Sequence, residues 1–325
     1  IYVSHKMDEV FRVCATATIL RDGRKVDDVV LKDTTESAVV ARMVGRELAN
    51  AEHKGFARDE IVLEVAGLTR GAAGAAAKGF AGGTHGTVVR DVGFQLRKGE
   101  VLGISGLVGA GRTELLRLIA GVDRPDAGEI RVEGRALPLG SPRAAIAAGL
   151  GLLPEERKRD GIVARRSVRS NIGLACLRRF ARLGFVRRRA LTEASMDLMR
   201  SLNLRPLAIE RPIGQFSGGN QQKAIIGRWI AAGARILLFD EPTRGIDVGT
   251  KAEIYALIER LAAEGRSMIV VSSELPEILR VADRVLVMRE GRIAGFLERD
   301  GLSEEAIVRL AVPQSAPSPI PVARS

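Results

Sequence analysis

Apolar residues follow two patterns along most of the chain. The run from Val101 to Ser105 predicts a strand, and residues 113–120 carry apolar side chains at the three- and four-residue spacing of a helix. Residues 236–239 are apolar on both faces, which is typical of a strand in the middle of a covered parallel sheet. The helix predicted over 250–265 has an apolar stripe that we expect in the core: Ile254, Leu257, Ile258 and Leu261.

The turn between the first of these strands and its helix is rich in glycine. Gly106, Gly109 and Gly111 allow successive backbone N–H groups to face phosphate oxygens, and the helix N-terminus adds partial positive charge. Thr113 supplies a hydroxyl of the kind that ligates magnesium in nucleotide-binding loops. Arg112 stands where lysine is expected, and its planar guanidinium prefers a bidentate grip to a point contact. The loop is also compatible with an ordinary turn. Taken as a phosphate site, it predicts nucleotide binding, while Arg112 in place of lysine argues against efficient hydrolysis.

Two carboxylates follow the apolar strand predicted at residues 236–239. Asp240 would hold magnesium and Glu241 would polarise an attacking water, as in P-loop ATPases. An acidic pair can also merely cap a strand. Its position 127 residues after Thr113, in a chain that also carries the glycine-rich loop, favours the nucleotide interpretation.

Two further segments resemble the ATP-binding cassette (ABC) family. The run from Ser217 through Gly218, Gly219 and Asn220 to Gln221 resembles its signature motif, and LLFDEPTRGID resembles its Walker B strand and D-loop, which includes Asp247. A serine hydroxyl and glycine N–H groups at a helix start form an anion site. In the family this site closes over ATP held by a partner cassette. Ser217, Gly218, Gly219, Gln221 and Asp247 are therefore expected nucleotide contacts.

The resemblance covers about residues 61–312, and SGGNQQK with ERKRDG is similar to the second cassette of bacterial monosaccharide importers. It implies an α/β P-loop fold with a parallel core sheet, an antiparallel β subdomain at its start and a helical subdomain around residues 160–220. ATP and Mg2+ are the implied cofactors. The implied partners are integral membrane permease subunits, a second ABC domain and, indirectly, a periplasmic sugar-binding protein.

The implied function is ATP hydrolysis that energises uptake of a monosaccharide or polyol, at the cytoplasmic face of the inner membrane. The alternatives are a soluble tandem cassette that acts on ribosomes or nucleic acid, and a non-catalytic regulatory module. The monosaccharide-type motifs favour transport.

An internal repeat organises the chain. Residues 3–24 align without gaps on 271–292, with 8 of 22 residues identical. This predicts that residues 1–50 are the last piece of a first cassette and that the chain is a fragment of a tandem protein or a truncated product. Residues 51–60 are then a linker, 61–312 the second cassette, and 313–325 a disordered tail rich in Pro and Ser.

The repeat places His5 opposite Ser273. In the family this position carries a histidine that binds the γ-phosphate and helps orient the attacking water, which a hydroxyl cannot do equally well. Glu155, or alternatively Glu156, stands where the family commonly has a glutamine that touches magnesium. With Arg112, these departures predict slow turnover in the site of this cassette. The site built from His5 and the signature of residues 217–221 is the better candidate for hydrolysis.

Composition adds a strong basic bias. The net charge is +11 and the pI is near 10.3, which suits nucleic acid or an anionic membrane surface. Low aromatic content, 4%, argues against stacking of single-stranded nucleic acid, so no nucleic-acid partner is expected. The arginines of residues 178–189, and the basic run 157–159, form either solvated clusters or contacts with a permease or lipid headgroups. Two isolated cysteines predict a reducing compartment.

Overall fold

The computed structural model describes residues 1–2, 7–21, 24–35, 38–39, 42, 54–71 and 88–312. The chain divides into two compact units, each considered by itself. The sheet unit comprises Phe56–Leu152, Ala234–Glu241 and Gly265–Ser325, and the helical unit comprises Ile1–Gly55, Leu153–Gly233 and Pro242–Glu264. Within the described residues, no helix combines the length and apolar character that crossing a membrane requires. His5 and the predicted tail 313–325 lie outside these residues.

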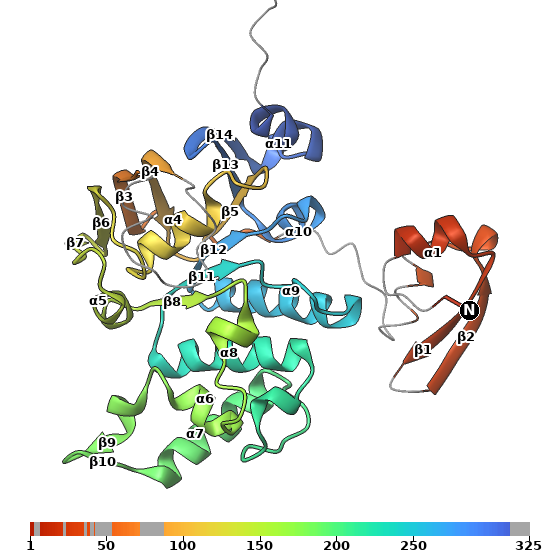
Figure 1. Cartoon of the computed structure of the whole chain (residues 1–325), viewed down its shortest axis with the longest axis horizontal. Helices are drawn as coiled ribbons and strands as arrows, with labels where there is room; N and C mark the ends of the chain where they lie inside the picture. The colour runs from red at the N-terminus through yellow and green to blue at the C-terminus, as the bar shows by residue number, and fades with distance from the viewer. Residues whose placement is uncertain are drawn as a thin grey trace, which may run out of the picture. The chain divides into compact units, whose positions relative to one another are not determined.

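A six-stranded sheet forms the centre of the sheet unit (Figure 1). Its order is β14 (Arg292–Glu298), β13 (Arg284–Arg289), β5 (Val101–Gly106), β12 (Ser267–Val271), β11 (Ile236–Asp240) and β8 (Leu150–Leu153). β13, β5, β12 and β11 pair in parallel, and β14 pairs antiparallel to β13. Every residue of β11 and β12 is buried. The predicted parallel core sheet is therefore confirmed.

An antiparallel sheet of four strands precedes and follows β5 in the sequence. It has the order β4 (Val89–Arg97), β3 (Ile61–Arg70), β6 (Ala127–Val132) and β7 (Arg135–Ala136). Its buried side chains share one hydrophobic core with β5 and with α4 (Arg112–Ile119). The remaining helices of this unit are α5 (Pro142–Ala147), α10 (Leu275–Val281) and α11 (Glu304–Ala311). The predicted β subdomain is confirmed.

Four α-helices are described in the part of the helical unit after residue 152. They are α6 (Val168–Gly173), α7 (Arg188–Ser201), α8 (Gly218–Ala232) and α9 (Val248–Ala263). The predicted apolar stripe of α9 is buried. Lys223 of α8 is almost fully buried and binds Glu253 of α9 at 2.5 Å and the carbonyl of Asn203 at 3.1 Å. The helical subdomain is where the sequence predicts it.

The N-terminal residues repeat the secondary structure that closes the sheet unit. α1 (Met7–Val13), β1 (Thr16–Arg21) and β2 (Arg24–Val30) begin and end at the positions that the sequence alignment pairs with α10, β13 and β14. The strand pairs even share a register shift, between Ile19 and Leu20 in one and between Val287 and Met288 in the other. The internal repeat is thus structural, whereas its origin in a first cassette stays a prediction.

Candidate nucleotide-binding site

The glycine-rich loop joins the end of β5 to the start of α4. Gly106, Gly109 and Gly111 all have positive φ, at 153°, 83° and 96°. A Cβ on Gly106 would overlap the backbone oxygen of Met288, whereas a Cβ on Gly109 would meet nothing within 4 Å. Gly111 begins α4 without a side-chain cap. The loop therefore leaves open space beside an uncapped helix N-terminus, the arrangement that binds phosphate.

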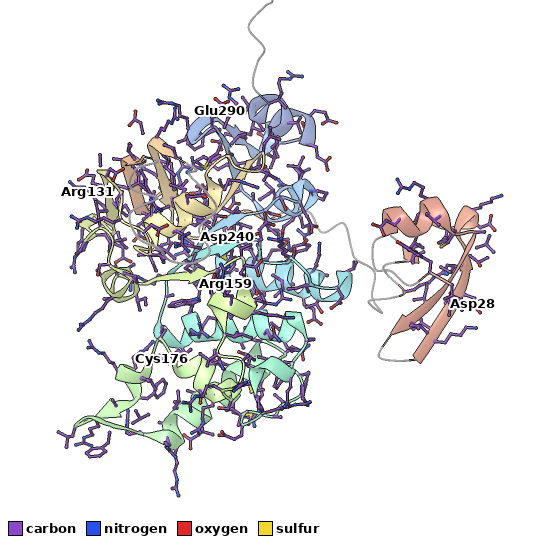
Figure 2. All side chains as sticks on the ribbon, in the orientation of Figure 1. Asp28, Arg131, Arg159, Cys176, Asp240 and Glu290 are labelled. Carbon is purple, nitrogen blue, oxygen red and sulfur yellow. The ribbon has the colours of Figure 1, made fainter. Side chains whose placement is uncertain are left out.

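Thr113 and Asp240 bring two oxygen donors together at this loop. The Thr113 hydroxyl donates to Asp240 Oδ1 at 3.2 Å, and Asp240 lies at the buried end of β11 with 3% exposure (Figure 2). Burial raises the pKa of Asp240 to about 7, against the lowering effect of the Thr113 hydrogen bond. A nearby divalent cation would favour the ionised form.

These two oxygens fit Mg2+ better than a metal that needs a complete protein cage. Mg2+ commonly takes one or two protein ligands and completes its shell with phosphates and water. The described ranges contain no group of three or more His, Cys, Asp or Glu side chains arranged to hold a metal. Thr113 and Asp240 would therefore hold Mg2+ only together with a bound phosphate.

Glu241 follows Asp240 in a left-handed backbone conformation, with φ 51°. Its N–H donates to the Val271 carbonyl at 2.9 Å, and its Oε2 accepts a hydrogen bond from Ser273 Oγ at 3.1 Å. Burial raises the pKa of Glu241, while Arg112 and Ser273 oppose the rise. A non-glycine residue in this region costs about 1–3 kcal/mol and is often found at functional sites. A carboxylate with a raised pKa is also a better proton acceptor.

Arg112 is tied to the main chain beside the predicted site of hydrolysis. Its Nη1 donates to the carbonyl of Ser272 at 2.8 Å. Burial lowers the pKa of Arg112, and the charges of Glu241 and Asp240 oppose this. Sequence reasoning missed Ser272, and no side-chain pattern points to it because the contact is through its carbonyl. The structure therefore brings Arg112, Thr113, the acidic pair and Ser273 together in the sheet unit.

The predicted signature residues lie at the start of α8 in the helical unit. Ser217 is the N-cap residue, but its Oγ does not cap the helix and instead accepts from Asn220 Nδ2 at 2.9 Å. Gly219 is required sterically, because a Cβ there would overlap the Thr250 side chain. The predicted nucleotide contact by Gln221 is not supported, since its side chain is buried and donates to the Phe216 carbonyl at 2.8 Å.

Two predicted acidic contacts already have partners within the helical unit. Asp247 caps α9, accepting from the backbone N of Thr250 at 3.0 Å and from its hydroxyl at 2.8 Å. Glu155 forms an ion pair with Arg244, whereas Glu156 is exposed. These contacts account for both side chains structurally, and their roles toward a nucleotide stay predictions.

Arg157 is a residue whose position the sequence did not reveal. Its Nη1 donates to the Arg244 carbonyl at 2.7 Å and its Nη2 to the Gly245 carbonyl at 3.3 Å. The same Nη2 lies 2.5 Å from where a Cβ of Gly218 would be. The half-buried Arg157 thus braces the D-loop against the signature turn, so the prediction of a solvated cluster is wrong for this residue, whereas a contact with a partner stays a prediction. Lys158 and Arg159 are exposed.

Comparison with known proteins agrees with this geometry. Residues 89–244 match the family model described as ABC transporter. A solved nucleotide-free ATP-binding cassette from an ABC transporter has TM-score 0.61 and 20% identity, over 78% of this chain and 100% of that one. A dimeric ATP-binding cassette bound to ADP and Pi has TM-score 0.61 and 19% identity, over 74% and 100%. Fold and site together define a P-loop ATP-binding cassette.

Curated relatives extend the match to almost the whole chain. "Putative ribose/galactose/methyl galactoside import ATP-binding protein 1" of Burkholderia lata is 45% identical over 96% of this chain and 58% of its own length. "Ribose import ATP-binding protein RbsA 3" of Rubrobacter xylanophilus is 45% identical, over 96% and 60%. The chain thus spans less than two thirds of these relatives. Residues 89–244 thus match the ABC transporter family, and almost the whole chain is similar to these ATP-binding proteins.

Proposed function

We propose that this chain is part of the ATP-binding subunit of an importer for ribose, galactose or a related sugar. The observation that carries the proposal is the group formed by the phosphate loop, the Thr113–Asp240 pair and Glu241. This group occurs in a chain 45% identical to relatives named as ribose or galactose import ATP-binding proteins. A P-loop with a buried acidic pair supports ATP hydrolysis, and the relatives' names support the sugar class.

The residues of the sheet unit suit distinct steps of ATP hydrolysis. The N–H groups of the loop and of the first turn of α4 would bind phosphate oxygens. Thr113 and Asp240 would hold Mg2+, which supplies positive charge to the phosphates when bound. Glu241 would accept a proton from the attacking water, and the Ser273 hydroxyl fixes its carboxylate at 3.1 Å.

The same residues support a slow site in this cassette. Arg112 is held by the Ser272 carbonyl, and Ser273 offers a hydroxyl where the family has an imidazole. Glu155 is engaged by Arg244. We assign faster hydrolysis to a second site. That site would be formed by the first cassette, whose last piece in this chain contains His5. It would be completed by Ser217, Gly218 and Gly219.

The proposal includes partners and location. The ATP-binding subunit would work with integral membrane permease subunits, a second ABC domain and, indirectly, a periplasmic sugar-binding protein. It would be peripheral at the cytoplasmic face of the inner membrane. The low aromatic content of the chain, 4%, argues against a nucleic-acid partner.

Uptake of radiolabelled ribose and galactose tests the function. Cells that lack the gene for the full protein are complemented with the wild-type gene or with an Asp240→Asn variant, and Arg131→Gln, an exposed substitution, is the control. Because loss of this magnesium ligand should prevent the cassette from holding the ATP on which it closes with its partner, restoration by the wild type and the control but not by Asp240→Asn supports the proposal. Equal uptake of both sugars with and without the gene, together with ATP binding by the purified chain, would reject sugar import and keep only a nucleotide-binding function.

A further inference from the structure

A long stretch of the helical unit carries only positive charge. Residues 161–192 contain nine arginines and no aspartate, glutamate or lysine. The whole chain has a net charge of +11, so this stretch holds most of the excess. Six of the nine surround a small β-hairpin, and neither ATP binding nor hydrolysis uses any of them.

The hairpin is short and ends in an apolar tip. β9 (Ala181–Arg182) pairs antiparallel with β10 (Phe185–Val186), following a 3-10 turn at Leu177–Phe180. Figure 1 shows it at an end of the helical unit, beside α6 and α7. Leu183 and Phe185 are 90% and 81% exposed.

Leu183 is an unfavourable residue for this turn. It has φ 49° and is followed by Gly184 with φ 82°, the left-handed pair that two-residue hairpins normally build from Asn, Asp or Gly. A leucine here gains no burial and adopts a conformation that is uncommon for residues with a Cβ. Folding of the hairpin therefore does not explain the leucine, whereas contact with something outside the chain does.

The arginine side chains around the tip are exposed, and most of them have no hydrogen-bond or ion-pair partner among the described residues. Arg179 donates to the Ala231 carbonyl. In the part of the chain that the structure describes, the other five have no hydrogen bond or ion pair from the side chain: Arg178, Arg182, Arg187, Arg188 and Arg189. No acidic residue lies on the hairpin to neutralise them. We call residues 177–189 the basic hairpin.

An apolar tip within a ring of unpaired arginines matches the interface of an anionic bilayer. Leucine and phenylalanine side chains bury in the boundary between headgroups and acyl chains, while arginines stay at the level of the lipid phosphates. An RNA would satisfy the arginines but leave Leu183 in water, and the hairpin tip offers one exposed aromatic for stacking. We infer that the basic hairpin binds anionic phospholipid headgroups directly, with Leu183 and Phe185 entering the interface. This inference does not depend on the transported substrate.

Vesicle co-sedimentation of the whole chain tests the inference. Phosphatidylcholine vesicles with and without phosphatidylglycerol are compared at low and high salt. The wild type is expected to bind only the anionic vesicles and to be released by salt. The triple variant Arg187→Gln/Arg188→Gln/Arg189→Gln is expected to bind about 100-fold more weakly, because each arginine near the surface contributes about fivefold.

Two matched variants separate a specific surface from general charge. The control Arg135→Gln/Arg143→Gln/Arg292→Gln makes the same charge change at exposed sites in the sheet unit and should bind like the wild type. Leu183→Ser/Phe185→Ser keeps every arginine and should bind the anionic vesicles at least about tenfold more weakly.

The inference is overturned if the control triple variant loses as much binding as the hairpin variant, because the attraction is then diffuse. It is also overturned if the Ser/Ser variant binds vesicles like the wild type, or if an RNA oligomer binds through the hairpin while the vesicles do not. Since all these residues are exposed, thermal unfolding of each variant is expected to match the wild type.

Discussion

A pair of glycine substitutions separates structural from ligand-binding parts of the phosphate loop. Gly106 and Gly109 both have positive φ, so an alanine at either position carries about 1–2 kcal/mol of backbone strain. At Gly106 the new methyl would also overlap the Met288 carbonyl, a main-chain atom that no rotamer change can move. Overpacking of this kind adds about 1–3 kcal/mol, so Gly106→Ala is expected to lose about 2–5 kcal/mol in total.

Gly109→Ala should instead separate stability from binding. Its methyl enters open space, so the unfolding free energy falls by only about 1–2 kcal/mol. That same space is where the loop would receive phosphate, so the affinity for MgATP should fall at least about tenfold, or 1.4 kcal/mol. Urea unfolding measures the first quantity and isothermal titration calorimetry the second. Unchanged MgATP affinity in Gly109→Ala, with the expected small loss of stability, would refute this position for the phosphates.

Two further predictions concern braces within the helical unit. Arg157→Ala removes two hydrogen bonds to carbonyls of the D-loop and should lower the unfolding free energy by about 1–2 kcal/mol. The control Arg159→Ala loses only a solvated ion pair and should leave urea unfolding unchanged. Equal effects of the two would contradict the bracing role. Lys223→Met leaves Glu253 without its partner; because Glu253 is partly exposed, we expect a loss of about 2 kcal/mol rather than the 3–5 of a fully buried pair. Glu253→Gln should cost more, because it leaves the almost fully buried Lys223 ammonium without its counter-charge. A wild-type stability for Lys223→Met would show the pair to be neutral.

The sequence located most elements because their signals are local or repeated. The apolar run of β5, the glycines after it and the helical spacing of α4 lie within twenty residues of one another. The N-terminal repeat transferred the pattern of α10, β13 and β14 to residues 7–30. In each case the prediction needed only periodicity or alignment, and the boundaries followed.

The contacts that sequence reasoning missed join distant segments through backbone atoms. Arg157 reaches the carbonyls of Arg244 and Gly245, 87 and 88 residues away, and Arg112 reaches that of Ser272 across 160 residues. A carbonyl is present at every position, so no residue type marks the partner. The burial of Gln221 was missed for another reason, since the fourth residue after the N-cap of α8 faces the core.

We assign a slow site to this cassette and a faster site to its partner, which this cassette completes. Steady-state ATP hydrolysis by the full-length protein tests this assignment, with two variants compared. Ser217→Asp keeps a good N-cap residue for α8 but places negative charge where the partner's phosphate would bind. Glu241→Gln removes the proton acceptor of this cassette's own site.

We expect Ser217→Asp to lower kcat by about 100-fold or more, the scale on which loss of a key electrostatic contact acts. Glu241→Gln should lower kcat by no more than about half, because the slow site contributes little to turnover. If Glu241→Gln abolished hydrolysis while Ser217→Asp retained it, the fast site would be the one in this cassette and the assignment would be reversed.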